Sequence, residues 1–523
     1  ETRYTLRCDL YEASDMSLDN TGFLGKDVQI QIRVGKIEAN SKSKSVNDGR
    51  ALFNEAMDDL ELMFPEIKKE KHSQFPDIFI YLVRGGKHIA YIRWTAVELL
   101  DLSKKKLDDK DYMPKWLTFI EEPCIDFFAP GDIPGFLLCS VTMGKDEVMA
   151  KAGRGGKLVE RVEQTYEMRF HLYMARFLPA KDENGLCDPY CVVKYYGQSL
   201  KSSVKMETCN PSWYETVVAD VVVPEPLELA PPITVLVYDE DKFSKDDLIG
   251  RFYVPLTKAM LVGGATPPMP EWKKLAFEYE GDVQGEVLAS ITMVPAGKKG
   301  DAPPPDLLPA TVDATVELSV VGLRDMTPVP LIGTLGSALG LGNMGIPLAS
   351  PYLEIDMGDA NTRQDTKVSS YPSANDPNYL ETYSVNMKLP KNELFAPTMT
   401  LRVRDIRSLP GGYVLGKPLV ATGTIALHDK LPWAKSFKPI EFPKGLFEVS
   451  ADADDAEKTK ATKKAHKSMA ARALAASKRM VEKMGDFLDD GEIDTPKYMV
   501  GRKTIDNELE DTYKYPNPIM EFP

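Results

Sequence analysis

Short stretches in which apolar and polar residues alternate recur along most of the chain, and this period of two constrains the fold more than any other feature. Residues 6–10 and 28–34 show it clearly. Such alternation places apolar side chains on one face of a half-buried β-strand. The same texture returns at 168–172, 233–237, 286–293, 316–320 and 399–403. Separated by Gly, Pro and Asn turns, these segments predict antiparallel β-sandwiches.

The alternating stretches fall into three groups, which we call the first block (residues 1–145), the second block (164–296) and the third block (312–445). A charged, glycine-containing linker precedes the second block, and a spacer with the run Pro303-Pro304-Pro305 follows it. Residues 446–523 are predicted to form a charged helical linker. The predicted fold class is therefore all-β with helical insertions, built from tandem antiparallel sandwiches.

Two segments depart from the β pattern. Between Asn47 and His72, apolar residues recur at helical spacing, which predicts an amphipathic helix inserted in the first block, with a core-facing position as the simplest interpretation. Between Lys458 and Lys483, nine Lys and Arg residues accompany several alanines. A basic helix of this kind either lies on anionic lipid or serves as a solvated spacer, and we favour the spacer.

Charge and residue usage exclude several classes of protein. The formal net charge of −14 argues against a general nucleic-acid binder. It also opposes binding to anionic membranes unless a cation or a local basic patch reverses the sign. The six cysteines show neither paired nor zinc-type spacing, which indicates free thiols in a reducing cytosol. Because the five histidines are scattered and neither a phosphate loop nor a nucleophile elbow occurs, we expect no enzymatic activity.

Two acidic clusters in the second block carry the clearest chemical signal. Each follows a hydrophobic strand, and together they supply five aspartates, namely Asp182, Asp188, Asp239, Asp241 and Asp247. Asp239 and Asp241 are two residues apart, so in extended backbone their carboxylates point the same way. Ca²⁺ prefers six to eight oxygen ligands, and clustered carboxylates repel one another unless a cation joins them. The alternative, a set of solvated acidic turns, explains one cluster better than it explains both.

The segments that carry these acids resemble the hallmark stretches of a C2 domain. They are residues 176–178, 182–190, 210–215 and 239–250. The resemblance implies that the five Ca²⁺-binding aspartates of that family fall on the five aspartates named above. Residues 173–176, together with Pro231-Pro232-Ile233, are more similar to ferlins than to synaptotagmins or protein kinase C.

The other blocks resemble ferlins in a different way. The third block is similar to the C2-like module that follows the Ca²⁺-binding one, but Ser350 and Arg407 stand where acids are expected. A guanidinium group would repel a cation, so we expect no Ca²⁺ site there. The first block is more loosely similar to a degenerate C2 domain, and its residues 75–91 resemble the ferlin segment called FerB. Its loop at 84–87 has no acid, and we expect no metal. Residues 507–510, within the charged linker, resemble the run-in to a further C2 domain, which implies such a domain outside the chain.

The resemblance also implies roles for further residues of the second block. Phe243 and Leu186 lie in the two acidic loops, where membrane-docking C2 domains insert hydrophobic side chains; the alternative is a pair of ordinary loop hydrophobes. Lys194, Lys201 and Lys205 could form a weak lipid-headgroup site, although a solvated face is the favoured interpretation. In the third block, the apolar, Gly-rich residues 331–350 either contact a membrane or a protein or fold back on their own domain.

The resemblance as a whole implies a Ca²⁺-regulated, phospholipid-binding ferlin-like module that acts in membrane trafficking, vesicle fusion or exocytosis. Its expected partners are an anionic phospholipid membrane and trafficking or fusion proteins, with no nucleic acid. Its expected place is the cytosolic face of membranes or vesicles, with a membrane anchor outside this chain. The alternative is a structural scaffold whose C2-like domains dock proteins in a large assembly. A lipid-modifying enzyme would need a catalytic domain outside the chain.

Overall fold

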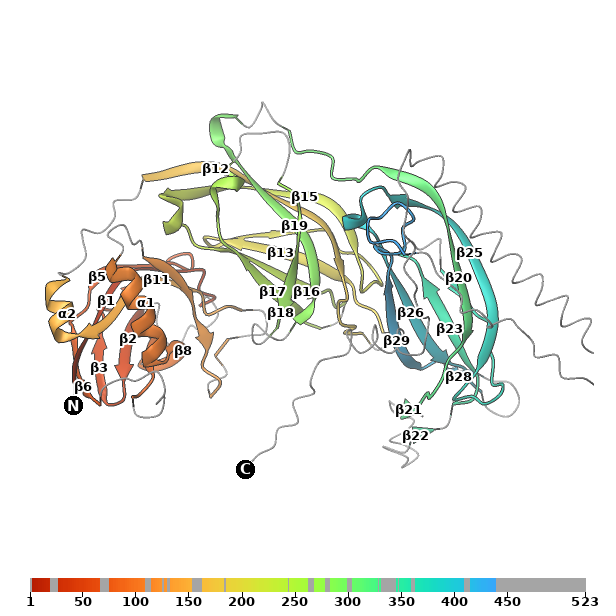
Figure 1. Ribbon diagram of the computed structural model, residues 1–523, viewed down its shortest axis with the longest axis horizontal. Helices are drawn as coiled ribbons and strands as arrows, with labels where there is room; N and C mark the ends of the chain where they lie inside the picture. Colours follow the sequence, from red (N-terminus) through yellow and green to blue (C-terminus); the bar gives the residue numbers. More distant parts are fainter. Residues whose placement is uncertain are drawn as a thin grey trace, which may run out of the picture. The chain divides into compact units, whose positions relative to one another are not determined.

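In a computed structural model, the chain folds mainly into antiparallel strands with few helices (Figure 1), which confirms the predicted all-β class. The structure describes residues 2–18, 27–65, 75–108, 114–124, 127–128, 132–152, 162–182, 185–242, 244–261, 268–277, 283–298, 303–327, 329–330, 345–346, 348–358, 363–408 and 414–438. The predicted linker at 446–523 and the basic segment within it lie outside these ranges, as does most of 331–350.

The described residues form two compact units. The larger contains those within 2–308, 319–382 and 400–424, and the smaller contains those within 309–318, 383–399 and 425–438. This division does not follow the predicted block boundaries, which remain a prediction.

The first block contains two antiparallel sheets that share one core. The first has the order β5-β1-β11-β9, with β6 also paired to β1, and the second has the order β10-β8-β7-β2-β3, with β4 paired to β2. Alternate residues of β1 and β2 are buried and meet in the same cluster, among them Leu6 and Ile30. The strands are β1 (Thr2–Ser14), β2 (Asp27–Val34), β3 (Ile37–Asn40), β4 (Lys44–Ser45), β5 (Ala51–Ala56), β6 (Leu60–Phe64), β7 (Ile78–Arg84), β8 (Lys87–Trp94), β9 (Lys115–Thr118), β10 (Ile120–Glu121) and β11 (Phe136–Lys145).

The helix predicted between Asn47 and His72 is wrong, because the described residues there form β5 and β6. Along β5, burial alternates with a period of two: Phe53 is 2% exposed, whereas Leu52 is 53% exposed. Met63 of β6 also points outward. These two outward apolar side chains completed an apparent helical stripe.

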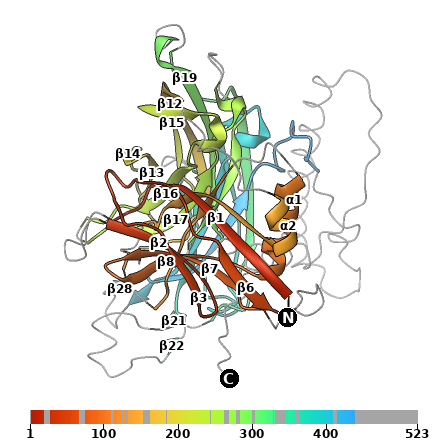
Figure 2. The ribbon, with the colours of Figure 1, turned by 90° about the vertical axis from the view of Figure 1, so that its left-hand side faces the viewer.

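Helices occur at two other places in this part of the chain, α1 (Ala96–Asp108) and α2 (Asp146–Lys151) (Figure 2). Both pack against β11. Before α1, the Thr95 amide donates to the Glu98 carboxylate at 2.8 Å, and the Glu98 amide donates back to the Thr95 hydroxyl at 3.3 Å. This reciprocal capping satisfies amides that have no partner within the helix, and it explains why the helix begins there.

The second block contains one eight-stranded sheet with the order β14-β13-β16-β17-β18-β19-β12-β15. A single register pair, Arg251 with Ala276, joins β17 to β18. Buried residues from the two halves, such as Val235 and Ile291, meet in one core, so the halves face each other as a sandwich. The elements are β12 (Val162–Arg176), β13 (Pro189–Tyr195), β14 (Gln198–Lys201), β15 (Ser212–Glu225), β16 (Ile233–Asp239), β17 (Asp247–Val254), β18 (Glu271–Ala276) and β19 (Val283–Pro295), with 3₁₀ turns η1 (Leu227–Leu229), η2 (Lys258–Met260) and η3 (Ala296–Lys298).

The third block contributes a four-stranded sheet with the order β24-β23-β26-β29 and the strand pairs β20-β25, β21-β22 and β27-β28. In the smaller unit, Leu389, Ala396 and Leu431 form a compact buried cluster. The elements are β20 (Thr311–Gly322), β21 (Val329–Pro330), β22 (Gly345–Ile346), β23 (Pro351–Asp356), β24 (Gln364–Asp365), β25 (Asn378–Pro390), β26 (Thr398–Asp405), β27 (Arg407–Ser408), β28 (Val414–Gly416) and β29 (Leu419–Ala426), with the 3₁₀ turn η5 (Glu393–Phe395).

A fully buried histidine lies inside the second block. The ring nitrogens of His171, on β12, are each 3.0 Å from a threonine hydroxyl, that of Thr216 on one side and that of Thr292 on the other. Burial and the nearby Arg169 lower the pKa of His171 to about 4. The imidazole is therefore neutral in the folded chain at neutral pH, and protonating it opposes folding.

His171→Gln should remove a pH-dependent part of the stability. Because the pKa of His171 is lower in the folded chain than the ordinary 6.5, its contribution is complete above about pH 6.5 and is lost as the pH falls toward 4. The loss amounts to about 3 kcal/mol across that window. Scanning calorimetry should show the melting temperature of the wild type rising more steeply from pH 4 to 7 than that of the variant. Replacement of the exposed His428 is the control, and parallel curves for His171→Gln would contradict the prediction.

Candidate functional site

Strand pairing brings the two acidic loops of the second block to the same end of its sheet. β13 and β16 are antiparallel neighbours, and Pro189, the first residue of β13, lies opposite Asp239, the last residue of β16. The end of the loop before β13 and the start of the loop after β16 therefore lie side by side. Asp182 and Asp188 belong to the first of these loops, and Asp241 belongs to the second.

Backbone hydrogen bonds close the first loop on itself. The amides of Lys181 and Asp182 each donate to the carbonyl of Leu186 at 3.2 Å, and the Gly185 amide donates to the Asp182 carbonyl at 3.0 Å. Gly185 has φ +79°, a backbone conformation that strains residues with a side chain. These bonds use main-chain atoms only, so they do not occupy the Asp182 carboxylate.

Asp239 is the buried centre of the acidic cluster. Asp239 is only 2% exposed, and its Oδ1 accepts a hydrogen bond from the Asp188 amide at 2.5 Å. Burial raises the pKa of Asp239 to about 6, and repulsion from Asp182, Asp188 and Asp241 acts in the same direction.

The pKa of Asp182, in the first acidic loop, also indicates that these aspartates lie close together. Burial raises its pKa, followed by repulsion from Asp188 and Asp241, while Lys242 acts in the opposite direction. Asp182, Asp188, Asp239 and Asp241 are thus close enough to repel one another. Asp247, the first residue of β17, lies opposite Asp239 in the strand register, and its side chain is exposed.

Asp246 closes the second loop, a role that the sequence analysis did not assign. Its Oδ1 accepts from the Asp241 amide at 3.1 Å, and its Oδ2 accepts from the Tyr190 hydroxyl at 2.5 Å. The Asp246-Asp247 pair was the only sequence signal for it.

The donor set suits Ca²⁺, because it consists of carboxylate oxygens on two adjacent loops. The ligand sphere is nevertheless open: among the described residues, no three Asp, Glu, His or Cys side chains are grouped tightly enough to hold a metal ion as they stand. The structure therefore brings four of the five predicted ligands near one another without assembling them into a closed site.

Leu186, predicted as a membrane-inserting residue, is buried in the structure, and its insertion stays a prediction. The residue is 4% exposed, and a Cβ built on its neighbour Gly185 would lie 2.4 Å from a methyl carbon of Leu419 on β29, so this side of the loop is covered. Phe243, the other predicted tip, lies outside the described residues. Lys242 and Ser244, on either side of it, are exposed.

The three lysines predicted as a weak headgroup site have different surroundings. Lys194 on β13 and Lys201 on β14 share the outer face of one hairpin, since Val192 lies opposite Lys201. The Lys201 ammonium is 3.0 Å from the Glu240 carboxylate and 3.6 Å from the centre of the Tyr190 ring. Lys205 lies in the following loop, where its amide donates to the Pro189 carbonyl. The headgroup role of these lysines stays a prediction.

In the third block, Asp405 corresponds to the buried Asp239, and its negative charge is balanced by an arginine. Asp405 is fully buried and accepts hydrogen bonds from the amides of Ala349 at 3.0 Å and Ser350 at 2.7 Å. Arg407 pairs with its other oxygen at 3.2 Å. Arg407 thus supplies the positive charge that a cation would supply in the second block.

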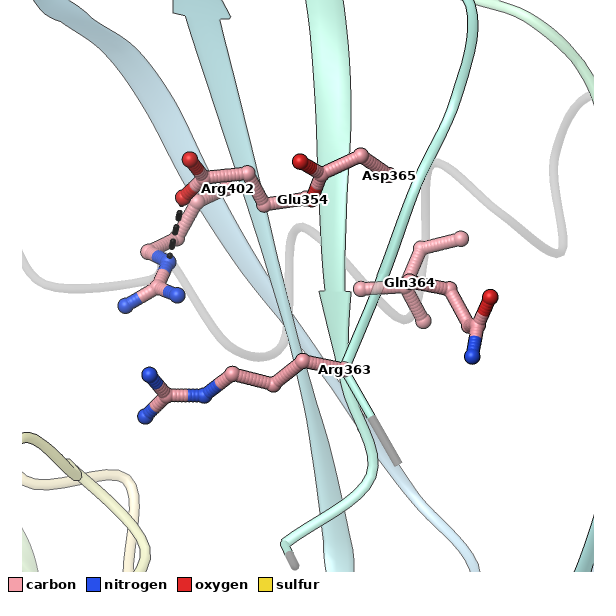
Figure 3. Close-up of a pocket in the computed structure, with 6 residues that line it drawn as sticks. Glu354, Arg363, Gln364, Asp365 and Arg402 are labelled. Atoms are coloured by element: carbon pink, nitrogen blue, oxygen red, sulfur yellow. Dashed lines mark ion pairs between the residues drawn. The ribbon is translucent and has the colours of Figure 1, made fainter. Parts of the chain in front are cut away.

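The same block has an open pocket that the sequence analysis did not identify. Its volume is about 390 Å³, and it is lined by Glu354, Ile355, Arg363, Gln364, Asp365 and Arg402 (Figure 3). The buried Arg402 pairs with Glu354 at 3.1 Å, and Arg404 pairs with the same carboxylate at 2.8 Å. With two arginines and two acids in its lining, the pocket carries balanced charge and favours neither an anion nor a cation.

Comparison with known proteins identifies two domains of this chain and its similarity to longer relatives. The model of the C2 domain family matches residues 166–275 and 329–432, so the chain contains two C2 domains, one in the second block and one in the third. Ferlin 1 of Toxoplasma gondii is 27% identical over 314 residues, which cover 58% of this chain and 21% of that protein. Myoferlin of Mus musculus is 28% identical over 276 residues, which cover 51% of this chain and 13% of that protein. The ferlin resemblance is thereby confirmed.

The chain spans about a fifth or less of the length of these relatives. Among solved structures, a tandem pair of C2 domains from Extended-Synaptotagmin 2 covers 54% of this chain and 85% of that chain, at 18% identity and a TM-score of 0.21. Across the described part of the chain, the helices are all too short or too polar to cross a membrane.

Asp239→Asn should stabilise the metal-free chain at pH 7. Because the pKa of Asp239 is raised, its contribution to stability is present below about pH 4 and is lost as the pH rises through 6, which leaves a repelled charge at neutral pH. Asparagine removes the charge and keeps the oxygen that accepts from the Asp188 amide. We expect a gain of about 1–3 kcal/mol, measured by thermal unfolding in a chelating buffer.

The exposed Asp247→Asn is the matched control for this experiment, since it removes an equal charge next to the cluster. It should have a much smaller effect. A lower melting temperature for Asp239→Asn than for the wild type at pH 7 would contradict the repulsion.

Proposed function

We propose that this chain, which carries two C2 domains and is similar to ferlins, binds anionic phospholipid membranes in response to Ca²⁺. The observation that carries the proposal is the group of mutually repelling aspartates around the buried Asp239, at the end of the second block. A buried carboxylate surrounded by like charges is unfavourable by itself, and the group becomes favourable once a divalent cation is present.

In this scheme, Asp182, Asp188, Asp239 and Asp241 hold the ion, and Asp247, beside Asp239 in the register, completes the set. Bound Ca²⁺ supplies the positive charge that relieves the repulsion and attracts lipid phosphates. The chain needs this local change of sign, because its net charge of −14 otherwise repels an anionic membrane. Only the second block acts as the sensor, since Arg407 neutralises Asp405 in the third.

The wider role that we propose follows the ferlin relatives. It is non-catalytic and serves membrane trafficking, vesicle fusion or exocytosis at the cytosolic face of membranes or vesicles, together with trafficking or fusion proteins. The membrane anchor of the full-length protein would lie outside this chain.

Vesicle flotation of the whole chain tests the proposal. The chain should float with phosphatidylserine-containing vesicles in Ca²⁺ but not in chelator, and it should bind phosphatidylcholine vesicles weakly. The double variant Asp239→Asn/Asp241→Asn should lose both flotation and Ca²⁺ binding by calorimetry, because it removes two carboxylates of the proposed ligand set, one of them the buried centre of the cluster.

The control neutralises the same number of charges at exposed positions of β20, as Asp313→Asn/Glu317→Gln, and should behave like the wild type. Ca²⁺ binding that survives in the aspartate double variant would refute the site. Ca²⁺ binding without any flotation would instead favour the scaffold alternative, in which the C2 domains dock proteins.

A separate prediction concerns Phe243, whose role rests on the sequence. Phe243→Ala should weaken Ca²⁺-dependent vesicle binding about tenfold to a hundredfold, the equivalent of roughly 1.5–3 kcal/mol for a buried aromatic side chain. Ca²⁺ affinity in solution should not change, because the aspartates hold the ion. Ser244→Ala, at the next residue, is the control. Equal vesicle binding by wild type and Phe243→Ala across lipid concentrations would show that docking is purely electrostatic.

A further inference from the structure

Asp188 is held by a loop that follows β14, residues 205–210, which we call the 205–210 loop. The Glu207 amide donates to Asp188 Oδ1 at 2.6 Å, and the Thr208 amide donates to the Cys187 carbonyl at 2.8 Å. The loop therefore runs alongside the segment that carries one of the proposed ligands, and its position fixes the Asp188 carboxylate.

The conformation of this loop is unfavourable by itself. Glu207 has φ +53°, in the left-handed region that residues with a side chain rarely adopt. In this conformation the Glu207 amide is aimed at Asp188. A strained residue persists where its surroundings hold it, so the contacts of Glu207 decide how well Asp188 is positioned.

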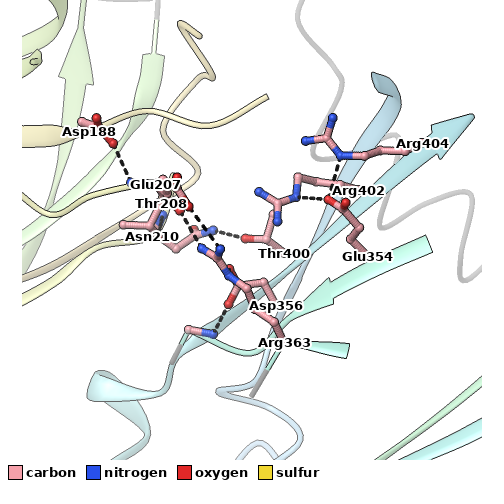
Figure 4. A network of polar contacts seen from close by, with 11 residues as sticks. Asp188, Glu207, Thr208, Asn210, Glu354, Asp356, Arg363, Thr400, Arg402 and Arg404 are labelled. Atoms are coloured by element: carbon pink, nitrogen blue, oxygen red, sulfur yellow. Dashed lines mark hydrogen bonds and ion pairs between the residues drawn. The ribbon is translucent and has the colours of Figure 1, made fainter. Parts of the chain in front are cut away.

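Those contacts come from Arg363, at the edge of the third block and within the same compact unit (Figure 4). Its Nη2 donates to the Glu207 carbonyl and its Nη1 to the Glu207 carboxylate, both at 3.2 Å, while its Nε is fixed by Asp356 at 3.0 Å. A planar guanidinium can make these three bonds together, whereas a lysine ammonium cannot reproduce their geometry.

Two more contacts hold the same region from the third block. The Asn210 amide group donates to the Thr400 hydroxyl at 2.7 Å, and both residues are buried. Leu419 covers Gly185 in the first acidic loop. The third block therefore contacts the second at the loops that carry or support Asp182 and Asp188.

We propose that Arg363 is a positioning residue for the calcium site: it holds Glu207, and through it Asp188, so that the third block raises the Ca²⁺ affinity of the second. This inference rests on the proposed function. It gives the third block, whose buried Asp405 is paired with Arg407, a part in sensing Ca²⁺. Residues that orient a metal ligand commonly change affinity as strongly as some ligands do.

Arg363→Lys in the whole chain is the test, because it keeps the positive charge and loses the three guanidinium hydrogen bonds to Glu207 and Asp356. We expect Ca²⁺ affinity, measured by calorimetry, to fall about tenfold. Arg404→Lys is the matched control: Arg404 lies on β26 and donates to Glu354 and to the Lys417 carbonyl, and the affinity of this variant should match the wild type. Combining Arg363→Lys with Asp188→Asn should abolish the effect of the lysine, since Arg363 would act through Asp188.

Hydrogen exchange of the Glu207 amide in metal-free protein gives a readout that does not depend on Ca²⁺. Exchange should be faster in Arg363→Lys than in the wild type or in Arg404→Lys. Unchanged affinity in Arg363→Lys, or the same loss in the Asp188→Asn background, would overturn the inference. If the wild type bound no Ca²⁺, the proposed function would fail separately, and unchanged Glu207 exchange would then overturn the positioning role as well.

Discussion

The antiparallel pairing of β13 with β16 is the constraint on which the candidate site depends. It places Pro189 opposite Asp239, so the loop that leads into β13 ends beside the point where the loop that leaves β16 begins. Acids about fifty residues apart in the sequence are thereby forced together in a place where burial strengthens their repulsion. The apolar residues buried in the sandwich core behind them, such as Val235 and Ile291, stabilise the fold and offset the unfavourable free energy of this repulsion.

The parts of this arrangement that were predictable from the sequence are those set by local spacing. Strand alternation indicated the β class, and the two acidic segments after hydrophobic strands indicated that their aspartates lie close together. The shared direction expected for the Asp239 and Asp241 carboxylates stays a prediction. The prediction of a helix between Asn47 and His72 was wrong because the spacing of apolar residues does not show which of them are buried. Leu52 and Met63 are apolar but exposed, and the real period of two appears only when burial is known.

Other features had no local signal. Arg363 meets Glu207 across 156 residues of sequence, and Asn210 meets Thr400 across 190, so each contact depends on tertiary structure rather than on a motif. Leu186 was read as an exposed tip because it lies in an acidic loop, yet the cover over Gly185 comes from Leu419, more than two hundred residues later. Asp246 has the same side chain as its neighbour Asp247, and only its contacts with Tyr190 and the Asp241 amide distinguish it.

The burial of Leu186 has a mechanical consequence under the proposed function. Of the two acidic loops, the first is covered near Gly185, while the second presents the exposed residues Lys242, Ser244 and Lys245. A lipid surface would meet the second block along one loop rather than along two. Contact along a single loop leaves rotation about that loop free, so the tilt of the block relative to the membrane could change while the block stays bound. Its final tilt would then be decided by whatever else in the protein touches the bilayer.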